Sequence, residues 1–534
     1  MLTGILLVLV TVILLLLGIL YNVQKKALSR IHVQEGSFKD YINIFTAIKK
    51  LILANVTKEE RAKLAKRQLE QAVAFDFKPY LTFFVYNPVV VINDPEGARR
   101  VLLNSKSFEK NTGLMKAVPH AQQFVGDNVV LTNGELWRQQ RSIMDPAFYN
   151  IERFSSVFAE KAKDCLDAML KKSTTNNMKV TVPTFMTSFA LDVLGRTVFG
   201  IPFDYISDAL ARDGNKTNAQ RKESNKKNIP TDEPSSDLSF LETYHYVLSN
   251  AFTIVKFLGG SAYSKIPTSS NLEYEKEIEK FDSLIYYVIK QAKKRREKGF
   301  DADYTPTLLD MMVDSVDDLT GQGMTERELR DNVVVFFVAG HDTTASALSS
   351  ALYVIGKHAD VQERLVKEIS EKVGMNNVPT FEQIESLDYL RMFLKENLRM
   401  YPPVTSVLGR ILNKDESIGS MNLKKGQAVQ VSVYSIHNNP HVWKNPEEFR
   451  PERFSEEEKK GRSSFAWIPF GGGPRTCIGN NFSLLEQKIF LINMLQRFVV
   501  SLPDPNYVLK TSTVAGILSA PDENLQVTLT KRSA

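Results

Sequence analysis

The hydrophobic pattern of the chain begins with an unbroken apolar run. Residues 1–22 contain no charged side chain, and Leu2 to Tyr21 is mostly Leu, Val and Ile. A helix of about 20 apolar residues crosses a bilayer core of about 30 Å. A cleaved signal peptide is the alternative, but its apolar region is normally about 7–15 residues long and follows basic residues, which are missing here. The run therefore predicts an uncleaved transmembrane anchor over residues 1–24.

Polar and apolar positions then alternate with a helical period over residues 25–75, which predicts a linker with amphipathic helical segments. Lys39 to Ala54 is one such segment, and Thr57 to Ala74 is a helix with a charged face. A small N-terminal sheet followed by a helix is predicted next, from Leu81–Tyr86, Val89–Ile92 and Glu96–Asn104.

Most of the remaining chain has helical periodicity. Thr325 and Glu328 form a capping-box pattern, which predicts the start of a long apolar helix from Leu329 to about His358. Residues 207–239 are rich in Asp, Asn, Lys, Ser and Pro, and this composition predicts a flexible surface insert. Further helices are expected over 240–257 and from Phe381 to Pro402, and strands at 498–502 and 525–530. The pattern as a whole predicts a mainly α fold with small β-sheets.

Composition and charge narrow the classes of function. The chain is 43% hydrophobic and 24% charged, as globular proteins are, and its net charge of +6 is small for 534 residues. No nucleic-acid motif is present, so no nucleic-acid partner is expected. Two cysteines exclude a disulfide scaffold and fit a reducing compartment. Lys25, Lys26 and Arg30 follow the anchor directly, so the positive-inside rule places the bulk of the chain in the cytosol.

The strongest chemical signal is a glycine-rich loop around a cysteine, Phe470-Gly-Gly-Gly-Pro-Arg-Thr-Cys-Ile-Gly479. Glycines allow backbone to approach a bulky flat group closely, and free N–H groups can stabilise a thiolate. Arg475 adds a cation two residues before Cys477. A haem iron takes a single protein thiolate, whereas zinc sites and iron–sulfur clusters usually need several cysteines. The only other cysteine, Cys165, is far away in sequence.

This loop resembles the cysteine-ligand loop of the cytochromes P450, F-x-x-G-x-R-x-C-x-G, at every fixed position. The resemblance implies haem b, with Cys477 as the axial iron ligand and Phe470 beside the cofactor. It also implies one large haem-thiolate domain over residues 76–534, mainly α with small β-sheets, behind a single-pass endoplasmic-reticulum anchor of the microsomal type. The proline-rich hinge usual after such an anchor is missing, and the insert at 207–239 is long.

A second match lies in the long helix, where Ala339-Gly-His-Asp-Thr-Thr344 resembles the family pattern A/G-G-x-D/E-T. By that resemblance, Gly340 would let oxygen and substrate approach the backbone. Thr343 and Asp342 would deliver protons during oxygen activation. His341 occupies the variable position about 100° around the helix from Gly340, so we expect it to pack or hydrogen-bond and not to ligate iron. A kinked structural helix is the alternative interpretation.

Two further groups of residues resemble structural parts of the family. Glu396 and Arg399, three apart on one helix face, would join Arg453 in a Glu–Arg–Arg network that supports haem retention. The spacing of Trp137 and Arg141 resembles the family's W-x-x-x-R helix, and these residues, with Arg410 and Arg475, would bind the haem propionates. Ordinary surface ion pairs are the alternative for these arginines.

The resemblance implies a monooxygenase that inserts one atom of O2 into a C–H bond. An NADPH-dependent cytochrome P450 reductase, and cytochrome b5 as a further donor, would supply electrons; candidate docking residues are Arg138, Lys459, Lys460 and Arg462. An isomerase or dehydratase that needs no reductase, or a haem-binding protein without turnover, remains open. Mostly apolar walls are expected at 115–126, 336–343, 404–408 and 514–518, which favours a hydrophobic substrate such as a steroid, fatty acid or xenobiotic.

Overall fold

The computed structural model describes residues 31–33, 64–84, 87–171, 177–212, 240–251, 253–514 and 517–532. No helix among these residues is both long and apolar enough to span a bilayer. The expected anchor at 1–24 and the helix at 39–54 lie outside the described residues. The flexible insert was expected to begin at residue 207, but residues 207–212 belong to a helix in which Ala209 is buried. Residues 213–239 lie outside the described residues.

Helices make up most of the described chain. In order they are α4 (Leu64–Ala74), α5 (Pro95–Leu103), α6 (Gly113–Lys116), α7 (Pro119–Val125), α8 (Gly134–Met144), α9 (Ser155–Leu170), α10 (Val182–Leu194), α11 (Tyr205–Arg212), α13 (Phe240–Ala251), α14 (Ile254–Ser264), α15 (Ser269–Lys298), α16 (Leu308–Val313), α17 (Glu326–Lys357), α18 (Ala359–Lys372), α19 (Phe381–Glu385), α20 (Asp388–Met400), α21 (Val433–His437) and α22 (Asn480–Arg497).

The strands among the described residues form four small sheets. The largest has the order β2-β3-β9-β6-β4, with β3 and β9 parallel and the other neighbours antiparallel. The others are β1-β8-β7, β10-β13-β5 and the pair β11-β12. The bounds are β1 (Ile31–Val33), β2 (Tyr80–Phe84), β3 (Asn87–Ile92), β4 (Phe108–Lys110), β5 (Asn177–Thr181), β6 (Arg410–Leu412), β7 (Glu416–Ile418), β8 (Met421–Leu423), β9 (Ala428–Val431), β10 (Phe498–Ser501), β11 (Thr511–Val514), β12 (Leu518–Pro521) and β13 (Gln526–Lys531).

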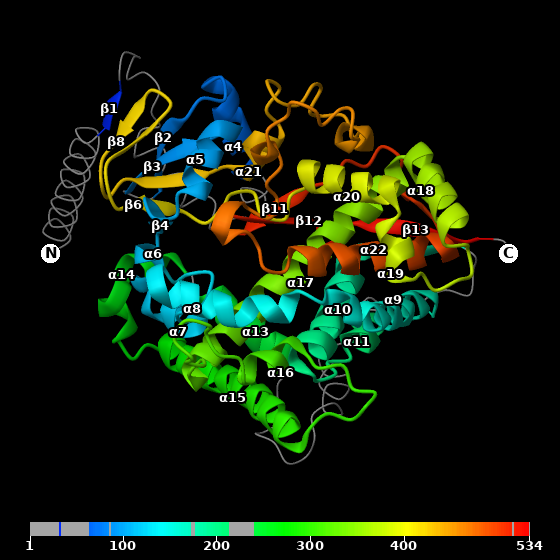
Figure 1. Cartoon of the computed structure of the whole chain (residues 1–534), viewed down its shortest axis with the longest axis horizontal. Coiled ribbons are helices and arrows are strands. Elements are labelled where there is room, and N and C mark those ends of the chain that lie inside the picture. Colours follow the sequence, from blue (N-terminus) through cyan, green and yellow to red (C-terminus); the bar gives the residue numbers. More distant parts are fainter. Residues whose placement is uncertain are drawn as a thin grey trace, which may run out of the picture.

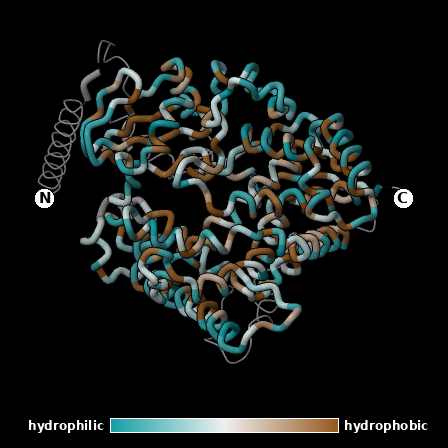
Figure 2. The backbone as a smooth tube through the Cα atoms, in the orientation of Figure 1, coloured by the Kyte–Doolittle hydropathy of each residue, from teal (hydrophilic) through white to brown (hydrophobic). Residues whose placement is uncertain are grey.

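Helix α17 is the central element of the helical part. It contacts α10, α15, α18, α20 and α22, and Figure 1 shows it between the end that holds β2, β3 and β6 and the helices α10, α15 and α16. Figure 2 shows hydrophobic positions mostly inside the outline and hydrophilic ones along the rim. The expected fold, mainly α with small β-sheets, is confirmed.

The capping box predicted for this helix is present. The Thr325 side chain accepts from the Glu328 backbone N–H at 3.2 Å, and the Glu328 carboxylate accepts from the Thr325 N–H at 2.8 Å. These bonds satisfy two backbone donors that a helix start otherwise leaves unpaired. They fix where α17 begins, and so fix which residues its middle turns present to the site.

Candidate active site

The cysteine loop is a tight turn held by its own backbone. The Cys477 N–H donates to the Phe470 carbonyl at 2.9 Å, and Gly471 and Gly473 adopt φ of 72° and 69°. A Cβ on Gly473 would lie 2.4 Å from the Leu102 carbonyl oxygen of α5, so this position requires glycine for both conformation and space. Helix α22 begins directly after the loop, at Asn480. The Cys477 side chain is therefore carried on a rigid turn between two helices.

Cys477 is an accessible thiol in a confined setting. Its sulfur is accessible to solvent. The protein atoms packed around it nevertheless disfavour a charge there, and this raises the pKa of the Cys477 thiol. The Gly479 N–H and the charge of Arg141 act in the opposite direction and lower that pKa. Arg141 also donates to the Thr476 carbonyl at 2.9 Å and pairs with Asp145. The loop thus presents one sulfur to an interior space, as a single axial ligand requires. Cys165 is wholly buried and takes no part.

Three basic residues near this loop, two of them buried and Arg475 half-buried, have no acidic partner among the described residues. Arg410 is 2% exposed, and its Nε and Nη1 atoms have no hydrogen-bond acceptor. Lys110 of β4, 8% exposed, is the direct cross-strand neighbour of Arg410 of β6. Arg475 lies with its guanidinium 3.9 Å above the Trp137 ring, and its Nε also lacks an acceptor. Among the described residues, no carboxylate lies within ion-pair distance of any of the three.

The pKa values of these three side chains are lowered, because few nearby negative groups offset their positive charges. Burial lowers the pKa of Arg410 to about 10 and that of Arg475 to about 9, the latter aided by the charges of Arg410 and Arg141. Burial and the same neighbours, Arg410 and Arg475, hold the pKa of Lys110 well below its usual value. Like charges placed opposite one another in a sheet are normally destabilising. A cluster of this kind is suited to an anionic ligand.

The middle of α17, residues 336–343, is the next part of the candidate site. The helix is buried along most of its length, but Ala339 is exposed and Phe336, Val338, Asp342 and Thr343 are partly exposed. The Thr343 hydroxyl donates to the Ala339 carbonyl at 2.8 Å. These residues form an accessible stripe on a helix that is otherwise mostly buried.

Gly340 lies against a neighbouring helix. A Cβ at this position would lie 3.0 Å from both terminal carbons of Leu194 in α10. That distance is tight, so glycine allows α10 to pack closely against α17. The expected approach of oxygen and substrate to the Gly340 backbone stays a prediction. The expectation for His341 is confirmed: it is fully buried, with Nδ1 2.6 Å from the Phe337 carbonyl oxygen.

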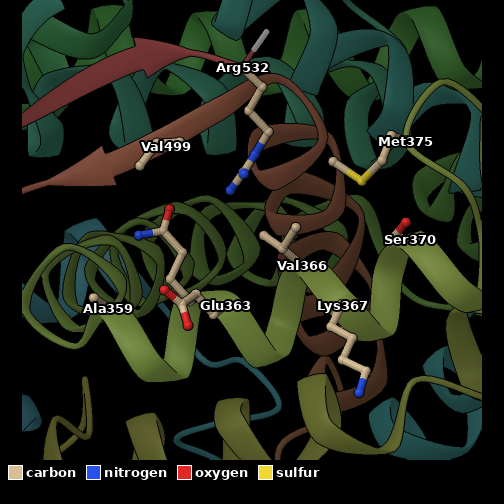
Figure 3. A pocket seen from close by; sticks show the side chains of 9 residues that line it. Ala359, Glu363, Val366, Lys367, Ser370, Met375, Val499 and Arg532 are labelled. Carbon is tan, nitrogen blue, oxygen red and sulfur yellow. The ribbon is translucent and has the colours of Figure 1, made fainter. Parts of the chain in front are cut away.

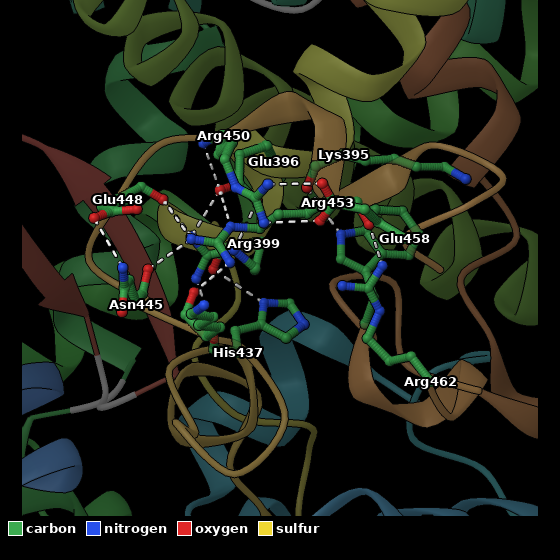
Figure 4. A network of polar contacts seen from close by, with 12 residues as sticks. Lys395, Glu396, Arg399, His437, Asn445, Glu448, Arg450, Arg453, Glu458 and Arg462 are labelled. Carbon is green, nitrogen blue, oxygen red and sulfur yellow. Dashed lines mark hydrogen bonds and ion pairs between the residues drawn. The ribbon is translucent and has the colours of Figure 1, made fainter. Parts of the chain in front are cut away.

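The Glu–Arg–Arg network assembles as predicted (Figure 4). Arg399 donates to both oxygens of the Glu396 carboxylate at 2.7 and 2.8 Å, and Arg453 donates to one of them at 3.2 Å. The Arg450 backbone N–H adds a fourth bond at 2.9 Å. Further donors reach the carbonyls of His437, Asn445 and Glu448. The network ties α20 to the segment that precedes the cysteine loop, so its role is structural.

Two of the expected docking residues are occupied by partners within the chain. Arg138 forms a bidentate pair with Asp317 at 2.8 and 2.9 Å. The Arg462 guanidinium lies 4.1 Å above the Trp443 ring, and the side chain also donates to the Arg453 carbonyl. Lys459 is exposed but pairs with Glu456. The first two arginines therefore have partners within the fold, and their role in docking stays a prediction.

Two of the four expected pocket walls meet in the structure. Val404 pairs with Leu518 in an isolated bridge, and the Thr405 N–H donates to the Ile517 carbonyl at 2.7 Å. A separate surface groove of about 510 Å³ lies between α18, β10 and Arg532 (Figure 3). Its lining mixes Glu363 and Lys367 with Val366 and Met375, and it shares no residue with the cysteine loop or α17. It is not part of the candidate active site.

The site fits haem b by its own chemistry. The cofactor carries two carboxylates, which match the uncompensated Lys110, Arg410 and Arg475, and an iron that one thiolate, Cys477, can ligate. Trp137 of α8 lies beneath Arg475, and Arg141 bonds the Thr476 carbonyl, while their expected bonds to the propionates stay a prediction. Lys110 was missed in the sequence because Glu109-Lys110-Asn111 matches no pattern. Its position opposite Arg410 arises only from the pairing of β4 with β6.

Comparison with known proteins agrees with this site. The family model described as Cytochrome P450 matches residues 72–528. Cytochrome P450 3A16 of Mus musculus is 29% identical over 417 residues, which cover 77% of this chain and 76% of the relative. Cytochrome P450 4V2 of Mus musculus is 26% identical over 464 residues, covering 83% and 81%. The crystal structure of the cytochrome P450DA heme domain superposes with a TM-score of 0.71 at 22% identity, covering 88% of this chain and 92% of that one.

Proposed function

We propose a substrate class, an electron donor and a location for this protein from one premise: the chain belongs to the cytochrome P450 family and is a haem b monooxygenase. It hydroxylates a hydrophobic small molecule, such as a steroid, fatty acid or xenobiotic. Its electrons come from an NADPH-dependent cytochrome P450 reductase, with cytochrome b5 as a further donor. It is anchored in the endoplasmic-reticulum membrane with its catalytic domain in the cytosol.

Each described residue of the site has a role in this reaction. Haem, when bound to a thiolate, supplies oxygen binding and favours O–O cleavage. Cys477 would ligate its iron, and Lys110, Arg410 and Arg475, with Trp137 and Arg141, would hold its propionates. Thr343 would orient a proton donor at its Oγ1 atom, and Asp342 would supply protons to it. Glu396, Arg399 and Arg453 keep the segment before the cysteine loop in place.

The observation that carries the proposal is the composition of the accessible stripe on α17. Its apolar members, Phe336, Val338 and Ala339, offer an apolar wall to a substrate, and its polar members, Asp342 and Thr343, lie directly beside them. Hydroxylation of a hydrophobic molecule needs both, because the substrate must be held and protons must reach oxygen. An isomerase has little use for the polar pair.

Turnover with a purified reductase tests the proposal. We expect NADPH oxidation that depends on substrate and yields a hydroxylated product across a panel of steroids, fatty acids and xenobiotics. Product without reductase would identify an isomerase, and no product with any substrate would identify a haem-binding protein. Reduced, carbon monoxide-bound protein should show the absorption of a thiolate-ligated haem, and Cys477→His should abolish it while Cys165→Ser should not.

A pair of adjacent threonines offers a matched test of the α17 stripe. Thr343→Ala should keep haem and substrate binding but lower product per NADPH and raise hydrogen peroxide release, because proton delivery is impaired. Thr344→Ala is the control, since the Thr344 hydroxyl instead bonds Ser483 of α22 at 2.9 Å. Equal product yield in both variants would remove Thr343 from oxygen activation.

Membrane orientation has its own test. Asn55-Val-Thr57 and Asn215-Lys-Thr217 are glycosylation sequons. In a cytosolic domain neither is glycosylated, so glycosidase treatment of protein from a eukaryotic host should leave the mass unchanged. A loss of mass would reverse the proposed orientation.

A further inference from the structure

His341, next to the proton-supplying Asp342, is enclosed on all sides. It is 0% exposed, and its ring packs edge-on against Tyr244 of α13 at 5.4 Å and beside Phe337 at 5.0 Å. A buried imidazole is stable only if its polar atoms have partners. The partners of its two nitrogens therefore reveal its chemical state.

Both ring nitrogens of His341 face oxygen atoms that accept hydrogen bonds. Nδ1 lies 2.6 Å from the Phe337 carbonyl oxygen. Nε2 lies 3.1 Å from Oδ1 of Asp342, which is ion-pair distance, but the pair does not have the geometry of a hydrogen bond. A carbonyl only accepts, and a neutral imidazole has a single N–H, which the carbonyl occupies. A favourable contact between Nε2 and the carboxylate therefore needs one further proton, on Nε2 of an imidazolium or on the carboxyl group.

The second oxygen of Asp342 is also held. The Tyr244 hydroxyl, on a fully buried side chain, lies 3.4 Å from Oδ2. The Asp342 side chain is nevertheless 41% exposed, on the stripe that also presents Thr343. The carboxyl group therefore contacts a buried proton donor on one side and is accessible on the other.

The charges around the pair favour the ionic form. Burial lowers the pKa of His341, but Asp342 and the Phe337 carbonyl raise it above its usual value overall. Burial raises the pKa of Asp342, but His341, His245 and Tyr244 lower it below its usual value overall. Tyr244 and His245 of α13 are the other ionisable groups that act on the pair, and burial raises the pKa of Tyr244, so it stays a neutral donor.

We propose that His341 is a proton store for the monooxygenase reaction: it holds a proton at Nε2 and passes it to Asp342, which releases it on the Thr343 side of α17. In this step the Nε2–H bond breaks and an O–H bond forms at Asp342, leaving neutral His341 with its Nδ1–H on the Phe337 carbonyl. A proton from bulk water later restores the pair through Asp342, because no other polar group reaches Nε2 among the described residues. Tyr244 is a positioning residue that holds Oδ2. The inference rests on the monooxygenase activity.

The charge state of His341 can be measured without turnover. The chain has seven histidines, so the His341 signals of isotope-labelled protein can be assigned by their loss in His341→Phe. In the diamagnetic, carbon monoxide-bound protein at about pH 7 we expect an imidazolium, because Nδ1 faces the Phe337 carbonyl oxygen and Nε2 faces the Asp342 carboxylate. Asp342→Asn should convert it to the neutral ring. A neutral His341 in the native protein, or one that ignores Asp342→Asn, overturns the proposal.

Turnover then tests the consequence. His341→Phe keeps the ring packing but has no proton, so product per NADPH should fall about tenfold and the peroxide share should rise. The loss should be smaller at acid pH, where water supplies protons more readily. His358→Phe, at the C-terminal end of the same helix, is the matched control and should change neither quantity. A pH-independent loss in His341→Phe would mark a purely structural residue and overturn the proposal. If no substrate gives product, the proposed function fails while the imidazolium remains testable.

Discussion

Two clusters of buried arginines in this molecule differ in one respect. Around Glu396, the guanidinium groups of Arg399 and Arg453 are matched by a carboxylate and by backbone carbonyls. Among the described residues no carboxylate forms an ion pair with Arg410 or Arg475, and three of their nitrogens lack any acceptor. Arg410 is buried as deeply as Arg399 and Arg453, whereas Arg475 is half-buried. Arginine side chains have their partners within the protein in the first cluster, whereas in the second they can bind an external anion.

Whether buried arginines have acceptors within the protein distinguishes a structural cluster from a ligand site, and no sequence motif is needed for this distinction. A buried charge without a partner is strongly destabilising, so a protein keeps one only where something else compensates it. Closed networks of charges mark parts of the fold that hold themselves together. Open ones mark ligand sites, and here the open one lies beside the only accessible cysteine among the described residues.

The largest effect should come from opening the closed cluster. Glu396→Gln leaves Arg399 and Arg453 buried with no carboxylate, so we expect the free energy of unfolding to fall by about 3–5 kcal/mol. Chemical unfolding of the purified protein measures this, and haem content should fall with it. Glu458→Gln is the control, because it removes a carboxylate from a half-exposed pair with Arg450 and should change stability by less than about 1 kcal/mol. A loss as small as that for Glu396→Gln would contradict the comparison.

Removing a cation from the open cluster should stabilise the haem-free protein but weaken the retention of haem. Arg410→Met removes an uncompensated buried cation, so the haem-free protein should become more stable by about 1–3 kcal/mol. With haem bound, the same change removes a propionate partner, and haem transfer to apomyoglobin should be about tenfold faster, or about 1.4 kcal/mol. Arg497→Met is the control, because Arg497 pairs with Asp167 and should not affect haem release. Destabilisation in both states would mean that Arg410 is structural.

The closed cluster was predictable from sequence and the open one only in part. Glu396 and Arg399 are three apart on one helix, so local spacing identifies them, and the family pattern adds Arg453. Cys477, Arg475 and the α17 motif were found in the same way. Lys110 was not, because its meaning depends on a strand pairing with a segment 300 positions later. The ion pair of Arg138 was not predictable for the same reason, since the fold brings Asp317 to it.

Element boundaries show a similar limit. One helix was expected from Phe381 to Pro402, but the structure has α19 and α20, separated at Ser386 and Leu387. The apolar period continues across this break, so hydrophobicity alone does not reveal it. The capping box of Thr380 with Gln383 marks only the start of α19, which was expected at Phe381. The interpretation of Gly340 was incomplete because packing against Leu194 is a tertiary contact.

A third prediction uses the acid sensitivity of the closed cluster. His437 accepts from the Ile468 N–H at 2.9 Å, so its Nε2 cannot carry a proton, and its Nδ1 lies 3.1 Å from the Arg399 carbonyl oxygen. Burial and the charge of Arg399 lower the pKa of His437 to about 3. The unfolded chain binds a proton near its ordinary pKa of about 6.5, so stability should fall as pH drops below that value, by about 2 kcal/mol near pH 5.

The measurement is unfolding free energy against pH. His437→Gln lowers stability at every pH but should flatten the slope between about pH 6.5 and about pH 5. His441→Gln is the control, because His441 is largely exposed beside Asp76 and cannot produce the same slope. An unchanged slope in His437→Gln would assign the acid sensitivity to other groups.

The smallest effect tests whether an unpartnered buried cation always marks an anion site. Lys256 of α14 is 2% exposed and its ammonium has no hydrogen-bond acceptor, but it lies 4.0 Å above the ring of Tyr274. The ring compensates part of the charge, as Trp137 does for Arg475, whereas among the described residues no ring does so for Arg410 or Lys110. Burial lowers the pKa of Lys256 to about 8. The unfolded chain keeps this proton up to about pH 10.4, so stability should rise with pH between those values.

Lys256→Met should stabilise the protein by about 1 kcal/mol near pH 7 and remove that rise. Lys78→Met, at a side chain 77% exposed, should do neither. If Lys256→Met instead weakened binding of carboxylate-bearing substrates, the lack of an acceptor alone would suffice to mark an anion site, and the aromatic ring would not count as a partner.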